Sequence, residues 1–133
     1  KGRIVAASCP AGPAFEGGSV SHGMPGYEGA IESLYWNLDK WNYNTIGELS
    51  PQGICGSGLI DLLAELRRHS IMNSKGAFTD KRKELTIIPE QSISFSRLDA
   101  SNLAQAKAAN YCGQYIVLRS LGIQNFSSLN FGR

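Results

Sequence analysis

The run Gln52-Gly53-Ile54-Cys55-Gly56-Ser57-Gly58-Leu59-Ile60-Asp61 decides the fold, because its three glycines lead directly into an amphipathic helix. We predict this helix from about Ser57 to His69. Apolar residues recur at the i, i+3, i+4 and i+7 spacing of one buried face, at Leu59, Leu62, Leu63 and Leu66. Charged residues lie largely off that face, at Asp61, Glu65, Arg67 and Arg68. The glycines therefore precede a helix N-terminus, where backbone N–H groups can bind an anion.

Two interpretations of these glycines are open. Small residues at a turn between a strand and a helix allow the two elements to pack closely, and they also expose backbone N–H groups to a phosphate. The run lacks the lysine of the G-x-x-x-x-G-K-[ST] pattern, so it is not a P-loop of that kind. For an isolated run of this type, packing is the favoured interpretation.

Composition predicts a single folded domain. The chain has 133 residues, of which 42% are hydrophobic, and this is enough to form a core. A net charge of +2 is too small to indicate nucleic-acid binding, and Lys81-Arg82-Lys83 is interpreted as a solvated turn. No apolar stretch approaches the roughly 20 residues of a membrane span. We therefore expect neither nucleic acid nor membrane as a partner.

The cysteines and histidines indicate no metal centre. Cys9, Cys55 and Cys112 form an odd, widely spaced set without a C-x-x-C pair, which predicts a reducing, cytoplasmic location. Adding His22 and His69 produces no zinc-like spacing. Each cysteine is expected to be a small buried hydrophobic residue, and no metal is expected in this chain.

Aromatic and β-branched residues predict a β-hairpin. Ala30–Trp36 and Trp41–Gly47 are the expected strands, with Asn37–Lys40 as a four-residue loop. Trp36 and Trp41 flank the turn, and a cross-strand aromatic pair is favoured over a platform for stacking a ligand.

The remaining elements follow from turn and cap residues. We expect a strand within Lys1–Cys9, a short helical turn near Pro13, strands at Glu84–Ile88 and about Ser92–Phe95, and a long helix that Asp99 or Ser101 caps and Gly122 closes after about Leu121. Lys107, in the middle of that helix, is expected to face solvent. Another strand is expected to start in Ser127–Arg133, so both termini look truncated and residues 1–133 look like one domain excised from a longer protein.

Three segments, in this order, resemble one family. They are Ser8–Gly18 (SCPAGPAFEGG) with Gly23-Met24 and Gly29–Glu32, then Gly53–Asp61, then Leu103–Ala109 (LAQAKAA). Together they are similar to the C-terminal domain of the ATP-dependent reductive activators of corrinoid proteins. The resemblance covers roughly residues 1 to 123.

The resemblance implies a fold and a function. The fold is an α/β part of an actin-like (ribonuclease H-like) ATPase domain of the acetate and sugar kinase, heat-shock chaperone and actin superfamily, with a mixed sheet, packed helices and a β-hairpin insertion. The implied function is ATP-driven return of Co(II) corrinoid methyl-transfer proteins to Co(I). ATP and Mg²⁺ are expected in the complete domain, and a [2Fe–2S] cluster only in an N-terminal domain that this chain lacks.

The chain departs from the family in what it lacks. The phosphate loops of the form D-x-G-T and D-x-G-T-N-G-E do not occur in it, and Phe131-Gly132 is all that matches the expected Ala-Gly-Gly-Phe-Gly segment. Because phosphoryl transfer needs carboxylates around Mg²⁺ and the phosphates, we expect no catalytic residues here. We expect this chain alone neither to hydrolyse ATP nor to carry an iron–sulfur cluster.

The same resemblance implies that eight residues lie near the nucleotide cleft: Gly12, Glu16, Gly17, Gly18, Gly53, Gly56, Ser57 and Gly58. Glu16 could hold a ribose hydroxyl or a metal-bound water, or could be only a carboxylate that the helix dipole favours. Ser57 is expected to cap its helix rather than touch a ligand. Cys55 is expected to be inert.

Two alternatives remain open from the sequence. The aromatic hairpin around Trp36 and Trp41 could dock a corrinoid protein or the rest of the ATPase domain, because exposed aromatic residues are common interface anchors. The chain could instead belong to another kinase or ATPase of the superfamily. A homodimer is compatible with either.

Overall fold

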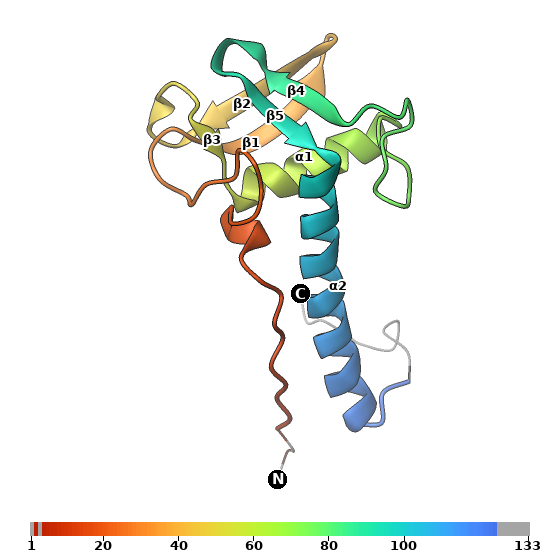
Figure 1. The fold of residues 1–133 in the computed structure, drawn as a ribbon. Helices are drawn as coiled ribbons and strands as arrows, with labels where there is room; N and C mark the ends of the chain where they lie inside the picture. The colour runs from red at the N-terminus through yellow and green to blue at the C-terminus, as the bar shows by residue number, and fades with distance from the viewer. Residues whose placement is uncertain (1, 3, 125–133) are drawn as a thin grey trace.

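The computed structural model describes residues 2 and 4–124. Within them, two small β-sheets pack with two α-helices (Figure 1). The elements are η1 (Ala14–Glu16), β1 (Ala30–Asn37), β2 (Lys40–Thr45), η2 (Ile46–Glu48), β3 (Gly53–Ile54), α1 (Gly56–Arg68), β4 (Glu84–Ile88), η3 (Pro89–Gln91), β5 (Ile93–Ser96) and α2 (Arg97–Ser120). One sheet has the order β2-β1-β3 and the other pairs β4 with β5. Since β1 is antiparallel to β2 and parallel to β3, the mixed sheet expected from the sequence is confirmed.

The hairpin is confirmed, but its turn is shorter than predicted. Asn37 pairs with Lys40, which leaves a two-residue turn instead of a four-residue loop. Both turn residues have positive φ, 50° at Leu38 and 58° at Asp39, as in the tight turns whose twist matches that of the strands. Leucine rarely adopts this conformation, so the sequence carried no clear signal for it.

The predicted aromatic pair is confirmed. Trp36 lies opposite Trp41 in the register, and their ring centroids are 4.9 Å apart in an edge-to-face arrangement with an interplanar angle of 72°. Such a geometry stabilises the end of a two-stranded ribbon.

The core face of α1 is confirmed, whereas its expected cap is wrong. Leu59, Leu62 and Leu66 are fully buried. The N-cap residue is Cys55, which makes no side-chain capping bond, and Ser57 is the second residue inside the helix. The hydroxyl of Ser57 turns to β1 instead, because a carbonyl of that strand is within reach.

β3 pairs only with Ala30 and Ile31, at the start of β1. Along the rest of the same edge of β1, a row of polar side chains from α1 takes the place of a neighbouring strand. The row has three hydrogen bonds: Ser57 Oγ to the Glu32 carbonyl (2.7 Å), the Leu34 N–H to Asp61 (3.2 Å) and the Trp36 N–H to Glu65 (3.1 Å). Four helical residues rise about 6 Å and two strand residues about 6.6 Å, so the two spacings match. We call Ser57, Asp61 and Glu65 the polar ladder.

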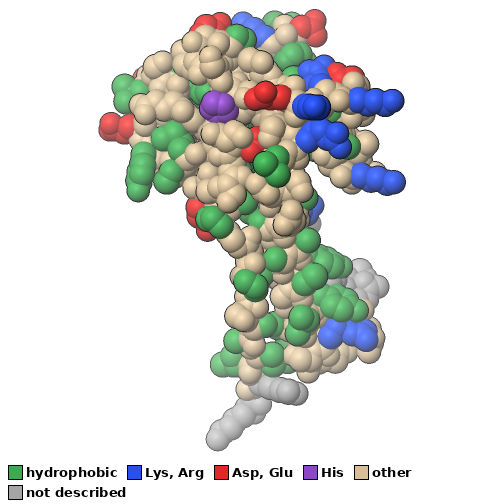
Figure 2. Space-filling view, in the orientation of Figure 1, with side chains coloured by type: hydrophobic (Ala, Val, Ile, Leu, Met, Phe, Trp, Pro, Cys, Tyr) green, Lys and Arg blue, Asp and Glu red, His purple; other side chains and the backbone are tan. Residues whose placement is uncertain are grey.

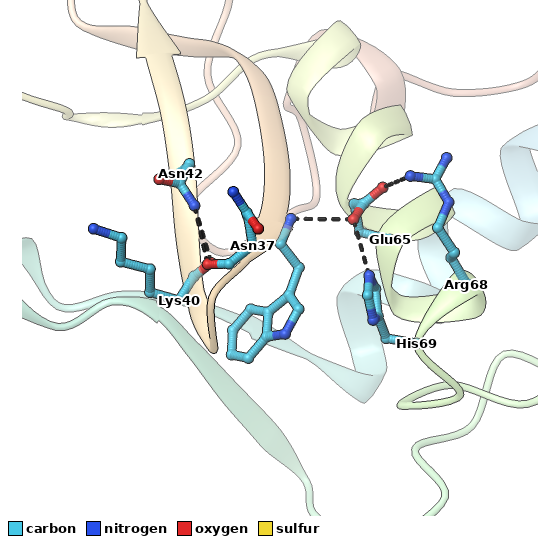
Figure 3. A network of polar contacts seen from close by, with 7 residues as sticks. Asn37, Lys40, Asn42, Glu65, Arg68 and His69 are labelled. Carbon is cyan, nitrogen blue, oxygen red and sulfur yellow. Dashed lines mark hydrogen bonds and ion pairs between the residues drawn. The ribbon is translucent and has the colours of Figure 1, made fainter.

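Glu65 is more buried than predicted. Its exposed fraction is 5%, although the helical pattern places it off the apolar face. Besides the Trp36 N–H, it contacts Arg68 at 2.5 Å and the His69 imidazole at 3.4 Å (Figure 3). These three partners compensate the carboxylate for the water it loses, which is why a charged residue can lie there.

The second helix begins earlier than predicted. Ser96 is the N-cap of α2, and Asp99 is the third helical residue; the two form a capping box in which each side chain binds the other's backbone N–H. The prediction of Asp99 or Ser101 as the cap is therefore wrong. Gly122, with φ of 81°, follows the end of the helix as predicted.

Two predictions at the chain ends have different outcomes. No strand forms in residues 4–12, where Ile4 is 96% exposed, because the described residues provide no neighbouring strand with which to pair. The strand expected in Ser127–Arg133 lies outside the described residues.

Three predicted elements inside the chain are confirmed. The helical turn near Pro13 is η1, and the strands near residues 84–88 and 92–95 are β4 and β5.

The core lies between the two sheets, α1 and the first half of α2. Its largest fully buried side chains include Phe95, Ile31, Leu34 and Leu103. The later half of α2 extends away from the sheets (Figure 1). Lys107, near the middle of α2, is exposed as predicted. Of the cysteines, only Cys55 is buried; the expectation is wrong for Cys9, which is half-buried, and Cys112, which is exposed.

Candidate functional site

The two glycine-rich segments, Gly12–Gly29 and Gly53–Gly58, lie side by side. Gly23 and Ile54 form an isolated parallel bridge. The Met24 N–H donates to the Ile54 carbonyl (3.0 Å), and the Ile54 N–H donates to the His22 carbonyl (2.8 Å). These bonds hold η1 and the loop after it against the start of α1.

Most of the candidate glycines contact the chain's own backbone. A Cβ atom at Gly17, Gly53, Gly56 or Gly58 would lie within 2.3–2.8 Å of a backbone atom: Met24 N, His22 O, Phe15 O and Ile31 O respectively. A Cβ at Gly18 would meet the Pro13 ring at 2.7 Å. Real Cβ atoms do not approach so closely, so each of these positions needs glycine for packing, as the sequence interpretation favoured.

Gly12 differs from the other candidates. It has φ of 70°, and a Cβ there would have no neighbour within 4 Å. It lies at a small pocket of about 150 Å³, whose lining is Ala11, Gly12, Pro13, Ala14, Ser19, Asn102 and Gln105. The Asn102 side-chain amide donates to the Ser19 carbonyl (2.5 Å), which ties α2 to the far wall of this pocket.

Asp99 joins the loop after η1 to the start of α2. This carboxylate is only 1% exposed and accepts four hydrogen bonds. One oxygen accepts from the Ser21 N–H (2.8 Å) and hydroxyl (3.0 Å), and the other from the Ser96 N–H (2.8 Å) and hydroxyl (2.7 Å). The Ser96-x-x-Asp99 pattern could have revealed the capping box. The bonds to Ser21, 78 residues away, have no local sequence signal.

Glu16 and Ser57 lie at different places around these segments. Glu16 is exposed in η1, and its side chain has no hydrogen bond or ion pair within the described part of the chain, whereas its backbone N–H donates to the Pro13 carbonyl. Ser57 is directed to the Glu32 carbonyl, and its oxygen also lies 3.3 Å from the Cys55 sulfur. The structure thus leaves Glu16 available for a ligand and engages the hydroxyl of Ser57.

A second hollow lies between the hairpin and β4. This groove of about 690 Å³ is bordered by Trp36, Trp41 and Tyr43 on one side and by Leu85–Glu90 on the other, with Asp39, Lys40, Ile71 and Arg82 also in its lining. The tryptophans predicted as interaction residues thus border the larger hollow, away from the glycine-rich segments. We call it the aromatic groove.

Residues 2 and 4–124 contain neither a metal-binding cluster nor a membrane-spanning helix. No group of three or more His, Cys, Asp or Glu side chains in this part is arranged to hold a metal ion. None of its helices is both long enough and apolar enough to cross a membrane.

Comparisons with known proteins identify the family. A family model described as the C-terminal domain of RACo, the ASKHA domain, matches residues 1–130. The corrinoid activation enzyme RamQ of Eubacterium limosum is 43% identical over 76 residues, which are 57% of this chain and 13% of RamQ. A solved structure of a reductive activator for corrinoid, iron-sulfur protein matches with a TM-score of 0.81 and 35% identity, over 91% of this chain and 22% of that chain.

The chain therefore spans between about an eighth and a quarter of the length of these two relatives. The family match and the structural match confirm both the resemblance predicted from the three motifs and the actin-like α/β fold it implies. The chain belongs to the family of C-terminal ASKHA domains of RACo, the reductive-activator family.

Proposed function

We propose that this chain forms one wall of the nucleotide cleft of an ATP-dependent activator that returns Co(II) corrinoid proteins to Co(I). The main support is the pocket at Gly12, where the residues around η1 meet Asn102 and Gln105 of α2. The bridge between Gly23 and Ile54 holds the loop after η1 against β3, which leads into α1. Family membership supports nucleotide binding, since ASKHA domains are ATPase domains. The names of the two relatives support a corrinoid protein as partner.

The residues present fit a nucleoside better than a metal-bound triphosphate. The pocket at Gly12 is lined by backbone, small side chains and the amides of Asn102 and Gln105, with no charged side chain in its lining. At about 150 Å³ it is smaller than the roughly 300–1,000 Å³ of complete small-molecule sites, so it would supply one wall. ATP and Mg²⁺, when bound, supply the phosphoryl-transfer chemistry; this chain would orient the nucleoside, with Glu16 available to a ribose hydroxyl.

The remaining parts of the proposal concern the complete protein. A [2Fe–2S] domain would supply the electron, the rest of the ATPase domain would supply the phosphate loops, and the protein would act in the cytoplasm. The glycines at positions 17, 18, 53, 56 and 58 would then frame the cleft, because their Cβ positions are filled by the chain itself.

Gly12→Ala tests this wall. In the full-length protein we expect the substitution to weaken ATP binding by about tenfold, because the new methyl group would take up pocket space that the nucleoside would otherwise fill. The measurement is the Kd of ATP by isothermal titration calorimetry, with the melting temperature recorded in parallel.

Gly122→Ala is the matched control, because Gly122 also has a positive φ, 81°, and no neighbour within 4 Å of its Cβ position. Both variants carry the same backbone strain, about 1–2 kcal/mol. Equal ATP affinity in the two variants would contradict the proposed wall.

A second candidate function is docking of a corrinoid protein at the aromatic groove. The observation that favours it is the size of this groove and its border of two tryptophans and a tyrosine. Large, rigid aromatic side chains supply much of the energy at protein interfaces. The alternative that the chain belongs to another kinase or ATPase of the superfamily loses its support, because the matching family is that of the reductive activators.

Intrinsic fluorescence separates the two candidates. Both tryptophans of the chain, Trp36 and Trp41, lie at the aromatic groove, so all tryptophan emission reports on this place. If the groove docks the partner, adding a corrinoid protein freed of its cofactor should shift the emission to shorter wavelength as water leaves the rings, whereas ATP should not. A shift with ATP alone would contradict docking at the groove.

A further inference from the structure

Positive charge is concentrated in one part of this nearly neutral chain. Seven of the 13 Lys and Arg residues fall between Arg67 and Arg97, whereas only three of the 11 acidic residues do. All seven are exposed: Arg67, Arg68, Lys75, Lys81, Arg82, Lys83 and Arg97. We call these seven residues the basic face. The sequence predicts only a solvated turn at Lys81-Arg82-Lys83.

The fold gathers the basic face from three elements. The end of α1 is tied to the next loop by a hydrogen bond from the Arg67 guanidinium to the Met72 carbonyl (2.7 Å). The Arg97 N–H donates to the Lys83 carbonyl (3.0 Å), so the start of α2 lies beside the start of β4. Lys75 and Arg97 line one shallow pocket of about 240 Å³. Figure 2 shows Lys and Arg side chains gathered on the side where Figure 1 places the loop between α1 and β4.

Five of the seven charges are not neutralised by an ion pair within the described residues. Arg68 pairs with Glu65, and Arg82 pairs with Asp80, whose pKa the hydrogen bond from Arg82 lowers. Lys75, Lys81, Lys83 and Arg97 make no such pair there, and Arg67 donates only to a neutral carbonyl. Exposed cations held close together repel one another, so an approaching negative surface gains energy from all of them.

We propose that the basic face is a docking surface for the acidic surface of a partner protein. Charge complementarity carries the argument: several unpaired cations come from a helix end, a loop and a helix start that the fold holds in fixed relation. Such a surface steers association and sets the partner's orientation. It lies apart from the residues that line the pocket at Gly12, so its failure would leave the proposed nucleotide wall untouched.

Aromatic burial argues against single-stranded nucleic acid at this face. Proteins that bind single strands combine cations with aromatic side chains on which bases stack. The two aromatic residues between Arg67 and Arg97 are Phe78 and Phe95, and their exposed fractions are 4% and 0%. The face thus offers charge without a stacking platform, which suits carboxylates on a protein.

A charge-reversal pair tests the proposal. Fluorescently labelled poly-L-glutamate serves as the probe, and its Kd for the chain is measured by fluorescence anisotropy at several salt concentrations. Lys75→Glu combined with Arg97→Glu should weaken binding by about tenfold or more at low salt, and the salt dependence should become shallower. Both side chains are exposed, and a carboxylate in the first turn of α2 suits the helix dipole, so the variant should fold.

The matched control is Lys107→Glu combined with Arg119→Glu, which changes the net charge equally but at two positions of α2 outside the basic face. Both of these side chains are also exposed. Equal weakening in the two double variants would overturn the proposal, because it would show only the effect of overall charge. Tighter binding of a single-stranded oligonucleotide than of poly-L-glutamate would also overturn it, in favour of nucleic acid.

Discussion

Gly17→Ala is expected to lower the free energy of unfolding by about 3–4 kcal/mol, the sum of left-handed strain and overpacking. A Cβ atom at this position would lie 2.3 Å from the Met24 nitrogen and 2.7 Å from the Gly23 carbonyl carbon. Both are backbone atoms, and the Met24 N–H is engaged in a hydrogen bond to Ile54, so neither can move without breaking the contact between the two glycine-rich segments. Urea unfolding followed by circular dichroism measures the change.

Gly76→Ala separates the two causes of this loss. Gly76 also has a positive φ, 75°, but nothing lies within 4 Å of its Cβ position. We expect its free energy of unfolding to fall only by the cost of the left-handed conformation, about 1–2 kcal/mol. If Gly17→Ala were no more destabilising than Gly76→Ala, the close approach at Gly17 would not be the reason for glycine there.

Asp99→Asn should also destabilise the chain strongly, by about 2–4 kcal/mol. Both carboxylate oxygens of Asp99 accept two hydrogen bonds each, from Ser21 and Ser96. An amide replaces one oxygen with an NH₂ group, which would then face two donors in a site that is only 1% exposed. Buried donors left without an acceptor lose the whole of their desolvation energy. Thermal and urea unfolding measure the loss.

Asp80→Asn is the control for the loss of a negative charge. Asp80 is exposed and pairs with Arg82 on the surface, so its replacement should leave the free energy of unfolding nearly unchanged. In addition, Ser21→Ala should reproduce part of the Asp99→Asn effect, because it removes one of the four donors. An unfolding midpoint for Asp99→Asn equal to that of Asp80→Asn would refute the role assigned to Asp99.

Local pattern predicts the elements of this fold well. The spacing of Leu59, Leu62 and Leu66 identifies α1, and the aromatic strands identify the hairpin, because each signal lies within one element. The boundaries of these elements are predicted less well where backbone geometry overrides the preferences of the residues. The turn at Leu38 and the cap at Cys55 both lack the residues that usually mark such positions.

Long-range contacts could not be read from the pattern. Glu65 is buried because a strand N–H some 29 residues earlier needs an acceptor, and Asp99 is buried because Ser21 approaches it across 78 residues. The basic face forms because α1, the loop after it and α2 meet. At the candidate site, the glycines were identified by residue type, but only the structure separates Gly12, with open space, from its tightly packed neighbours.

The polar ladder also hinders aggregation of this chain with other copies of itself. An uncovered side of a strand is a template on which another molecule can add a strand, and growth of this type leads to aggregation. On the β1 side beyond β3, side chains of α1 already occupy two N–H groups and a carbonyl, so an incoming strand would have to displace a helix. The outer strand β2 uses a different defence: it carries Lys40, Asn42 and Asn44, residues that extend a sheet poorly.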